Sequence, residues 1–170
     1  MDLSQAENRL VAYIGRIVQM IEAFENKKDI HSLVATMMAN LFYAGKLPPD
    51  FNPRKTIAPI GKGDKPWRDW GKKTGHAANY DISYKTLALA NEIPEREAKV
   101  ILNIYHTGFP GVRNGFHAYV QKCLRTNRTL TNYMGRKTLF TDQLDDELFR
   151  AAYSCIPQGT VGDIIDRRGL

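Results

Sequence analysis

The sequence has only two cysteines, no long apolar run and no apolar stretch near its start. Its two cysteines, Cys123 and Cys155, are 32 positions apart without a C-x-x-C spacing, which suggests neither a disulfide framework nor a zinc site. Polar residues interrupt the longest apolar candidate, residues 10–24, so it falls short of the roughly 20 apolar residues of a membrane span. Residues 2–9 carry three charges where a signal peptide would be apolar. We therefore expect a reducing, cytoplasmic location and no membrane association.

Acidic charge is scarce in one segment. The 170 residues carry a net charge of +6, with 43% hydrophobic and 25% charged residues, which is normal for about one packed domain. Residues 46–73 contain eight basic and three acidic side chains, and this net +5 accounts for nearly the whole excess. A positive run beside Trp67 and Trp70 favours a phosphate-rich partner, because cations neutralise phosphates and aromatic faces stack on bases. The alternative is a solvated basic loop.

Apolar spacing predicts a mainly α fold with one small β-hairpin. Residues 45–66 contain five prolines and three glycines, which predicts a long, flexible loop. Four helices have a predicted N-terminal signal: a Ser4 to Glu7 capping box, caps at Asp29 and Asp142, and Pro94 followed by acidic residues. The predicted helices cover about residues 5–25, 30–41, 68–89, 94–105, 112–124, 144–155 and from 160 on, and the hairpin strands cover residues 129–133 and 137–140.

Two groups of residues could carry chemistry. Lys72, His76, Tyr80 and Tyr84 recur every four positions, so one helix would align them, and Arg68 extends this stripe by a turn. A stripe that changes from cationic to aromatic suits a ligand with a triphosphate at one end and a flat base at the other. The alternative is an ordinary helix face with both tyrosines in the core.

Two carboxylates stand at the start of the first predicted helix. Asp2 lies just before this helix and Glu7 lies in its first turn. The alternatives are a capping role for Glu7 and a disordered terminus for Asp2.

Taken together, six short blocks resemble the family A DNA polymerases, the class of bacterial DNA polymerase I and many phage replicases. They occur in the family's order between residues 2 and 160, so the match is specific. They are D-L-S-Q-A-E at 2–7, like motif A; D-I-H at 29–31; the stretch 68–84 with G-H-A-A-N-Y, like motif B of the phage branch; F-P-G-V at 109–112; G-R-K at 135–137; and P-Q-G-T at 157–160.

The resemblance implies a role for each candidate residue. Asp2 would be one of two catalytic carboxylates that hold two Mg²⁺ ions. Glu7, with Tyr84 as its partner, would be the steric gate, the side chain that closes the space a ribonucleotide 2′-hydroxyl would need. Tyr80 would stack on the incoming base and sugar. The remaining implied contacts are the triphosphate for His31, Lys72 and His76, with Arg68 or Lys73 as alternative or additional phosphate ligands, and the primer-template for Gln158 and Arg136.

The resemblance therefore implies a DNA-directed DNA polymerase that binds deoxynucleoside triphosphates and primer-template DNA, in the cytoplasm of a bacterial cell or phage-infected host. Residues 1–170 would be its helical fingers with fragments of the palm, from a truncated or split gene. The H-D-E motif that carries the second catalytic carboxylate does not occur in the sequence. We expect the isolated chain to be inactive unless another polymerase fragment supplies that group in trans. The alternatives are a non-catalytic basic DNA-binding remnant and a purely structural helical domain.

Overall fold

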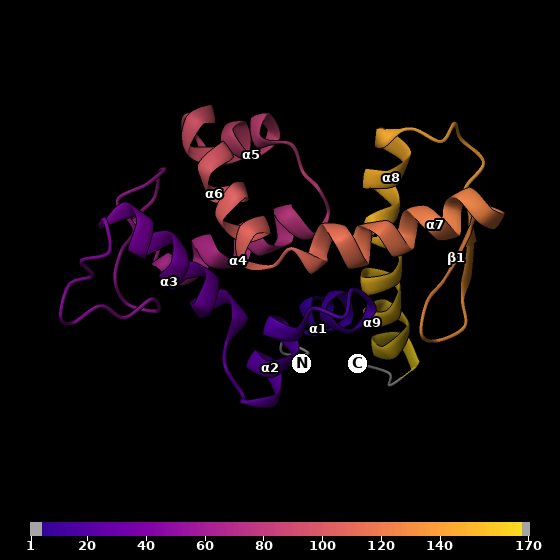
Figure 1. The fold of residues 1–170 in the computed structure, drawn as a ribbon, viewed down its shortest axis with the longest axis horizontal. Coiled ribbons are helices and arrows are strands. Elements are labelled where there is room, and N and C mark those ends of the chain that lie inside the picture. The colour runs from indigo at the N-terminus through magenta and orange to yellow at the C-terminus, as the bar shows by residue number, and fades with distance from the viewer. Residues whose placement is uncertain (1–4, 168–170) are drawn as a thin grey trace. The chain divides into compact units, whose positions relative to one another are not determined.

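The computed structural model describes residues 5–167 and is mainly α-helical with one β-hairpin, as predicted (Figure 1). No helix within this range is long and apolar enough to cross a membrane. The chain divides into two compact units. The terminal unit contains residues 1–21, 79–81 and 110–170, and the central unit contains residues 22–78 and 82–109.

The first predicted helix is two helices. α1 (Ala6–Ile14) ends at Gly15, and α2 (Val18–Glu25) begins after Arg16, whose φ is 50°. The break follows from a close approach of backbones in the terminal unit: a Cβ on Gly115 would overlap the Gly15 carbonyl. The predicted capping box is not the cap of α1. The N-cap is Gln5, without a side-chain cap, and Ser4 lies outside the described residues.

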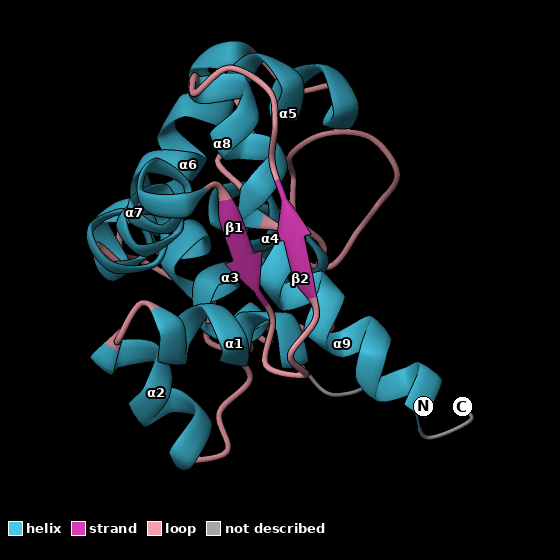
Figure 2. Cartoon of the chain, turned by 90° about the vertical axis from the view of Figure 1, so that its right-hand side faces the viewer, coloured by secondary structure: helices cyan, strands magenta, loops and turns pink. Residues whose placement is uncertain are grey.

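The terminal unit is completed by segments from the second half of the chain. The π-helix η1 (Val112–His117) leads into α7 (Ala118–Asn127), and α1 packs on η1 and on the last helix. The predicted hairpin is confirmed: β1 (Thr129–Thr131) and β2 (Lys137–Leu139) pair antiparallel, with Leu130 opposite Thr138 (Figure 2). The last helices are α8 (Asp146–Tyr153) and α9 (Cys155–Arg167).

Side-chain hydrogen bonds fix the local geometry of these elements. In the hairpin turn, the Asn132 amide oxygen accepts hydrogen bonds from the Met134 and Arg136 N–H groups at 3.0 and 2.9 Å. The cap of α8 is Asp145, which accepts from the Leu148 N–H at 2.9 Å, so the prediction of Asp142 was wrong. The apolar pattern predicted a helix from residue 144, but α8 begins at Asp146, and a capping residue stands directly before the first helical residue.

The central unit holds four helices and the long Pro/Gly-rich segment. These helices are α3 (Ile30–Phe42), α4 (Trp67–Asn79, whose last residue belongs to the terminal unit), α5 (Tyr84–Asn91) and α6 (Glu95–Gly108). Trp67 is buried against the rings of Phe42 and Tyr43, with centroids 5.8 and 6.1 Å away. A Cβ on Gly71 would overlap the His31 carbonyl oxygen, so α4 approaches α3 at backbone distance.

The long segment between α3 and α4 contains neither helix nor named strand, as predicted. An isolated bridge between Ile57 and Pro66 pairs two parts of this segment with each other, and the side chain of Ala58 is buried. Gly61, with a φ of 65°, lies against the Trp70 ring, where a Cβ would overlap ring carbons. The flexibility expected for this loop stays a prediction.

Candidate functional site

Glu7 has a different partner from the one that the motifs implied. It lies in the first turn of α1, and its carboxylate accepts a hydrogen bond from the Tyr80 hydroxyl. Tyr80 is buried, with 7% of its surface exposed, so its hydroxyl meets the carboxylate at the edge of the terminal unit's core. The assignment of Tyr84 as the partner of Glu7 was wrong. Tyr84 instead begins α5, and the Lys99 ammonium lies 4.3 Å from its ring centroid.

Tyr84 is not the partner of Glu7 because α4 ends before Tyr84, and the regular four-residue spacing of the stripe does not show this helix end. The predicted helix 68–89 is interrupted after Asn79, where Asp81 has a φ of 54° and Ser83 caps α5 by accepting from the Thr86 N–H at 3.1 Å. Four-residue spacing therefore aligns the stripe only as far as Tyr80. In the sequence, Asp81 and Ser83 are residue types that are common at helix boundaries, and together they are a weak signal of this end.

The corrected partner of Glu7 shifts the roles expected for the residues of the stripe by one helical turn. With Tyr80 as the partner of Glu7, the stacking position that the resemblance gave to Tyr80 would fall one turn earlier on α4, at His76. Lys72 and Arg68 lie one and two turns before His76 on the same helix. Lys72 and His76 are both exposed on α4, whereas Arg68 is half-buried.

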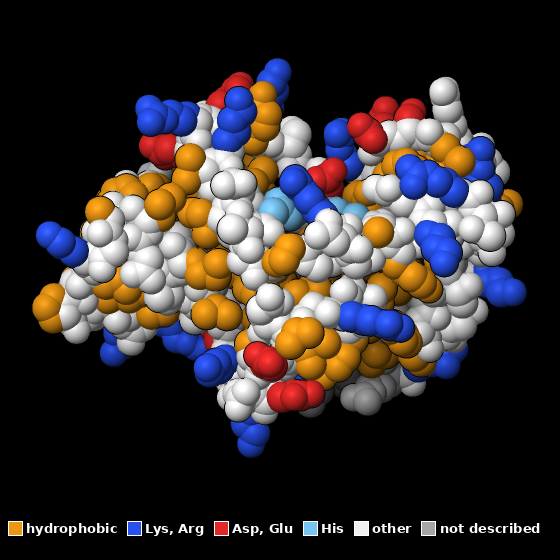
Figure 3. Space-filling view, in the orientation of Figure 1, with side chains coloured by type: hydrophobic (Ala, Val, Ile, Leu, Met, Phe, Trp, Pro, Cys, Tyr) orange, Lys and Arg blue, Asp and Glu red, His pale blue; other side chains and the backbone are white. Residues whose placement is uncertain are grey.

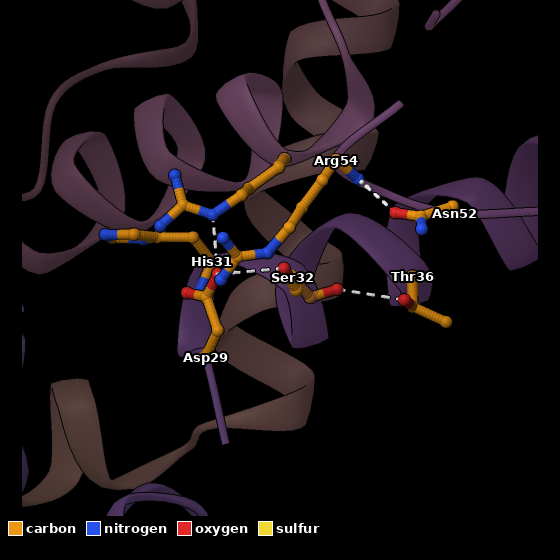
Figure 4. A network of polar contacts seen from close by, with 7 residues as sticks. Asp29, His31, Ser32, Thr36, Asn52 and Arg54 are labelled. Atoms are coloured by element: carbon orange, nitrogen blue, oxygen red, sulfur yellow. Dashed lines mark hydrogen bonds and ion pairs between the residues drawn. The ribbon is translucent and has the colours of Figure 1, made fainter. Parts of the chain in front are cut away.

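Arg68 is held by an acidic side chain of α3. Its Nε donates to the Asp29 carboxylate at 2.5 Å. A terminal nitrogen of Arg54 donates to the same carboxylate oxygen at 2.8 Å, and Figure 4 shows Arg54 beside Asp29. Asp29 also caps α3, as predicted, by accepting from the His31 N–H at 3.1 Å. Burial raises the pKa of Asp29, but hydrogen bonds from Arg68 and Ser32 outweigh it and hold the pKa below its ordinary value.

His31 and Lys73 are less accessible than their assigned roles require. His31 is 8% exposed and lies where α3 approaches Gly71 of α4. The Lys73 ammonium donates to the Asn91 side chain at 2.6 Å and lies 4.8 Å from the centroid of the Trp70 ring. Burial, and then the neighbouring ammonium of Lys65, lower the pKa of Lys73. Lys72 is therefore the better placed of the two lysines for a ligand in solvent.

Tertiary partners reduce the charge of the basic segment 46–73. Asp29 pairs with Arg54 and Arg68, and Glu92 pairs with Lys62, although neither acid belongs to the segment. Lys and Arg side chains are scattered over the face drawn in Figure 3 and do not merge into one patch. The positive charge that this segment can offer to a partner is therefore smaller than its net charge of +5 indicated.

Arg136 and Gln158 line one cavity of about 220 Å³ in the terminal unit. Arg136 Nε donates to Asp163 at 3.0 Å, and a terminal nitrogen donates to the Gly159 carbonyl at 3.2 Å. Hydrogen bonds from Asn132, at 2.5 Å, and from Arg136 lower the pKa of Asp163. The structure thus brings together the two residues expected to contact DNA, and Gln158 is exposed.

The expected metal site is not visible in the described part of the chain. Asp2 lies outside it, and residues 5–167 contain no group of three His, Cys, Asp or Glu side chains that could hold a metal ion. Mg²⁺ binding by Asp2 stays a prediction.

Sequence reasoning missed a buried polar cluster behind the Glu7 and Tyr80 pair. Asn79 donates its side-chain amide to Asn8 at 2.6 Å, and its backbone carbonyl lies 2.8 Å from His117 Nε2. All three residues are buried. Their only sequence signal was polarity at core-facing helix positions.

Comparison with known proteins supports the family that the motifs implied. The sequence profile described as DNA polymerase family A matches residues 1–168. DNA polymerase I of Mycobacterium leprae (strain TN) is 28% identical over 170 residues, covering 96% of this chain and 17% of that protein. The thermostable DNA polymerase I of Thermus aquaticus is 25% identical over 174 residues, covering 97% and 18%.

A solved structure shares the fold. The POL domain of Pol1 from M. smegmatis, in complex with DNA primer-template and dNTP, matches with a TM-score of 0.70 and 26% identity, over 98% of this chain and 29% of that chain. The chain belongs to DNA polymerase family A. It spans less than a fifth of the length of the two DNA polymerase I relatives. The phage-type branch stays a prediction.

Proposed function

We propose that this chain is the nucleotide-selecting part of a DNA-directed DNA polymerase and binds a deoxynucleoside triphosphate. The observation that carries the proposal is the hydrogen bond from the Tyr80 hydroxyl to the Glu7 carboxylate. A half-buried carboxylate in that contact suits a steric gate. A 2′-hydroxyl would have to displace Tyr80 or leave a polar group unpaired, and either costs binding free energy.

The cations of α4 suit the other end of the nucleotide. Lys72, exposed one turn before His76, would bind the triphosphate as a point charge. Arg68 would assist, because its contact with Asp29 uses Nε and leaves both terminal nitrogens of the guanidinium group for a further ligand. His76 would face the base. The dNTP in the M. smegmatis POL domain supports this ligand class.

We also propose that Arg136 and Gln158 contact primer-template DNA, the second ligand of that POL domain. Nucleotidyl transfer would need two Mg²⁺ ions, which supply charge neutralisation, and a second carboxylate in addition to Asp2. That carboxylate would come from another polymerase segment, in cis or in trans, because the sequence contains no H-D-E motif. A cytoplasmic location stays an expectation. The alternative of a basic DNA-binding remnant is not favoured, since Asp29 and Glu92 offset the basic segment.

Calorimetric titration of the chain with dATP and with ATP, each with Mg²⁺, tests the proposal. We expect tighter binding of dATP. Glu7→Ala should raise the affinity for ATP about tenfold with little change for dATP, because it removes the group that excludes the 2′-hydroxyl. Lys72→Ala should weaken both nucleotides about equally, since it removes a phosphate contact.

The matched control is Lys85→Ala, which removes an exposed lysine from α5. It should leave both affinities unchanged. A chain that binds neither nucleotide, or a Glu7→Ala variant with an unaltered preference, would contradict the proposed function.

A further inference from the structure

The turn that follows α4 is held at three adjacent points within the terminal unit. The Asn79 side-chain amide donates to Asn8, the Tyr80 hydroxyl donates to Glu7, and the Asn79 carbonyl lies 2.8 Å from His117 Nε2. Asn8 and Glu7 are neighbours on α1, and the residues that they contact, Asn79 and Tyr80, are consecutive in the turn. The third contact comes from η1 and is the only one of these three that is made to the backbone of the turn.

We propose, on the basis of the function proposed above, that His117 is a positioning residue for sugar selection: it holds the Asn79 carbonyl so that the Tyr80 hydroxyl stays on Glu7. Rotation of the Asn79 peptide would swing the attached Tyr80 Cα and its ring. An error of about 1 Å in such a group is enough to change recognition strongly.

His117 is built into the core of its unit as a rigid support. It is 4% exposed, and its ring stacks on Tyr153 with centroids 4.0 Å apart and planes 20° apart. The Tyr153 hydroxyl in turn accepts a hydrogen bond from Gln121 at 2.7 Å. The imidazole therefore has little freedom to leave the Asn79 carbonyl.

The protonation state of His117 suits a fixed donor. Burial lowers the pKa of His117, and the hydrogen bond to Asn79 opposes this effect only in part. A carbonyl oxygen can only accept, so Nε2 carries the hydrogen in the neutral ring. The charged groups nearby are Asp81, on the same turn, and Arg113 and Arg150, which lie 3.8 and 3.9 Å from its carboxylate.

The backbone around His117 also resists adjustment. η1 is a π-helix, an uncommon widened turn that is often found at functional sites. Gly115 within it touches the Gly15 backbone, where a Cβ would overlap the carbonyl oxygen. The contact fixes η1 against α1, the helix that carries Glu7 and Asn8. The donor, the turn and the gate carboxylate thus share one rigid frame.

A pair of substitutions separates the hydrogen bond from packing. His117→Gln keeps an amide donor at about the reach of Nε2, whereas His117→Asn keeps the amide on a shorter side chain that does not reach the carbonyl. His117→Phe keeps the stacked ring and removes the donor. Leu124→Ala, a buried change in α7, is the control for lost stability alone.

The first readout needs no nucleotide. In chain labelled with 3-fluorotyrosine, the ¹⁹F signal assigned by Tyr80→Phe should shift and broaden in His117→Phe and His117→Asn. It should stay near its original position in His117→Gln and Leu124→Ala. The positioning role is overturned if the Tyr80 signal does not move in His117→Phe and His117→Asn, the two variants without a donor that reaches the Asn79 carbonyl. An equal shift in Leu124→Ala would overturn it as well. If His117→Phe fails to fold, the Asn and Gln pair decides.

The second readout is the preference for dATP over ATP in the titration described above. We expect the preference for dATP over ATP to fall about tenfold in His117→Phe and His117→Asn, because ATP binds more tightly and not because dATP binds more weakly. His117→Gln should keep the preference. If wild-type chain binds neither nucleotide, the proposed function fails and the fluorine signal alone decides the role of His117. If wild-type chain discriminates and all His117 variants do so equally, the inference is wrong.

Discussion

Removal of Asp29 should destabilise the central unit in two separable ways. Its carboxylate caps α3 through the His31 N–H and also binds Arg68 and Arg54. The Asp29 side chain is 13% exposed and that of Arg68 is 28% exposed, whereas that of Arg54 is 63% exposed. The first ion pair is therefore partly shielded from solvent, and the second is not.

The expected cost follows from these contacts. Loss of the cap costs about 1 kcal/mol. Leaving the half-buried Arg68 without its anion costs about 1–2 kcal/mol, and the exposed Arg54 adds little. Asp29→Ala should thus lower the free energy of unfolding by about 2–3 kcal/mol. Asp29→Asn keeps a capping oxygen and should lose only the charge-dependent part, about 1–2 kcal/mol.

Urea denaturation followed by tryptophan emission measures this loss. Both tryptophans of the chain, Trp67 and Trp70, lie in the central unit with Asp29, so their emission reports that unit. With a slope of about 2 kcal/mol per molar urea, Asp29→Ala should lower the midpoint by about 1–1.5 M. The control is Asp145→Ala, followed by far-UV circular dichroism. Asp145 caps α8 and has no ion pair among the described residues, so only about 1 kcal/mol should be lost.

The charge-dependent part should also depend on pH. Because the pKa of Asp29 is lowered in the folded chain, its stabilisation is present above the ordinary value of 3.8 and is lost as the pH falls through the folded value. Asp29→Asn should remove that part of the acid sensitivity. The reasoning is refuted if Asp29→Ala costs no more than Asp145→Ala, or if Asp29→Asn leaves the acid sensitivity of unfolding unchanged.

Four further results are expected. The 170-residue chain should not extend a primer with Mg²⁺ and deoxynucleotides, because it lacks an H-D-E carboxylate; extension in a gel assay would contradict this. Arg136→Ala should weaken duplex binding and lower the salt slope by about 1 in fluorescence anisotropy, and an unchanged slope would remove Arg136 from the DNA contact. Stability should rise with pH up to about 6.5 through the lowered pKa of His117, and His117→Gln should flatten this rise in thermal melts. Gly71→Ala should destabilise by about 2–3 kcal/mol in the tryptophan urea assay, because its Cβ would overlap the His31 carbonyl, whereas Gly162→Ala in α9 meets no atom and should stabilise by up to about 1 kcal/mol in urea unfolding followed by far-UV circular dichroism.

Local signals in the sequence were sufficient for several elements. The Asp29 cap and the apolar spacing after it predicted α3, and Pro94 followed by acidic residues predicted α6. The hairpin around Gly135, which has a φ of 87°, was also predicted. In each case the signal and the structure that it sets lie within a few residues of each other. The short motifs likewise identified the family, because a motif is recognised from its residue types and their order in the sequence, without any tertiary structure.

Tertiary structure decided where two predicted helices end. The helical pattern across residues 5–25 is continuous, yet α1 ends at Gly15 because this backbone meets Gly115, a hundred residues later. The pattern across residues 68–89 is likewise interrupted after Asn79, whose turn is fixed by Asn8 and His117. Periodicity reports which face of a helix is apolar, but contacts between distant segments decide where it stops.

The candidate site shows the same division. The sequence by itself determined that Glu7, Lys72, His76 and Tyr80 are candidates, because their residue types and motif blocks carry the chemistry. Only the folded chain decided that Glu7 pairs with Tyr80, since four-residue spacing continues through a helix end that the spacing itself does not reveal. The charge of the basic segment also depends on acids elsewhere in the chain, such as Asp29. Hydrogen bonds and ion pairs act through space, so only the tertiary structure determines which partners meet.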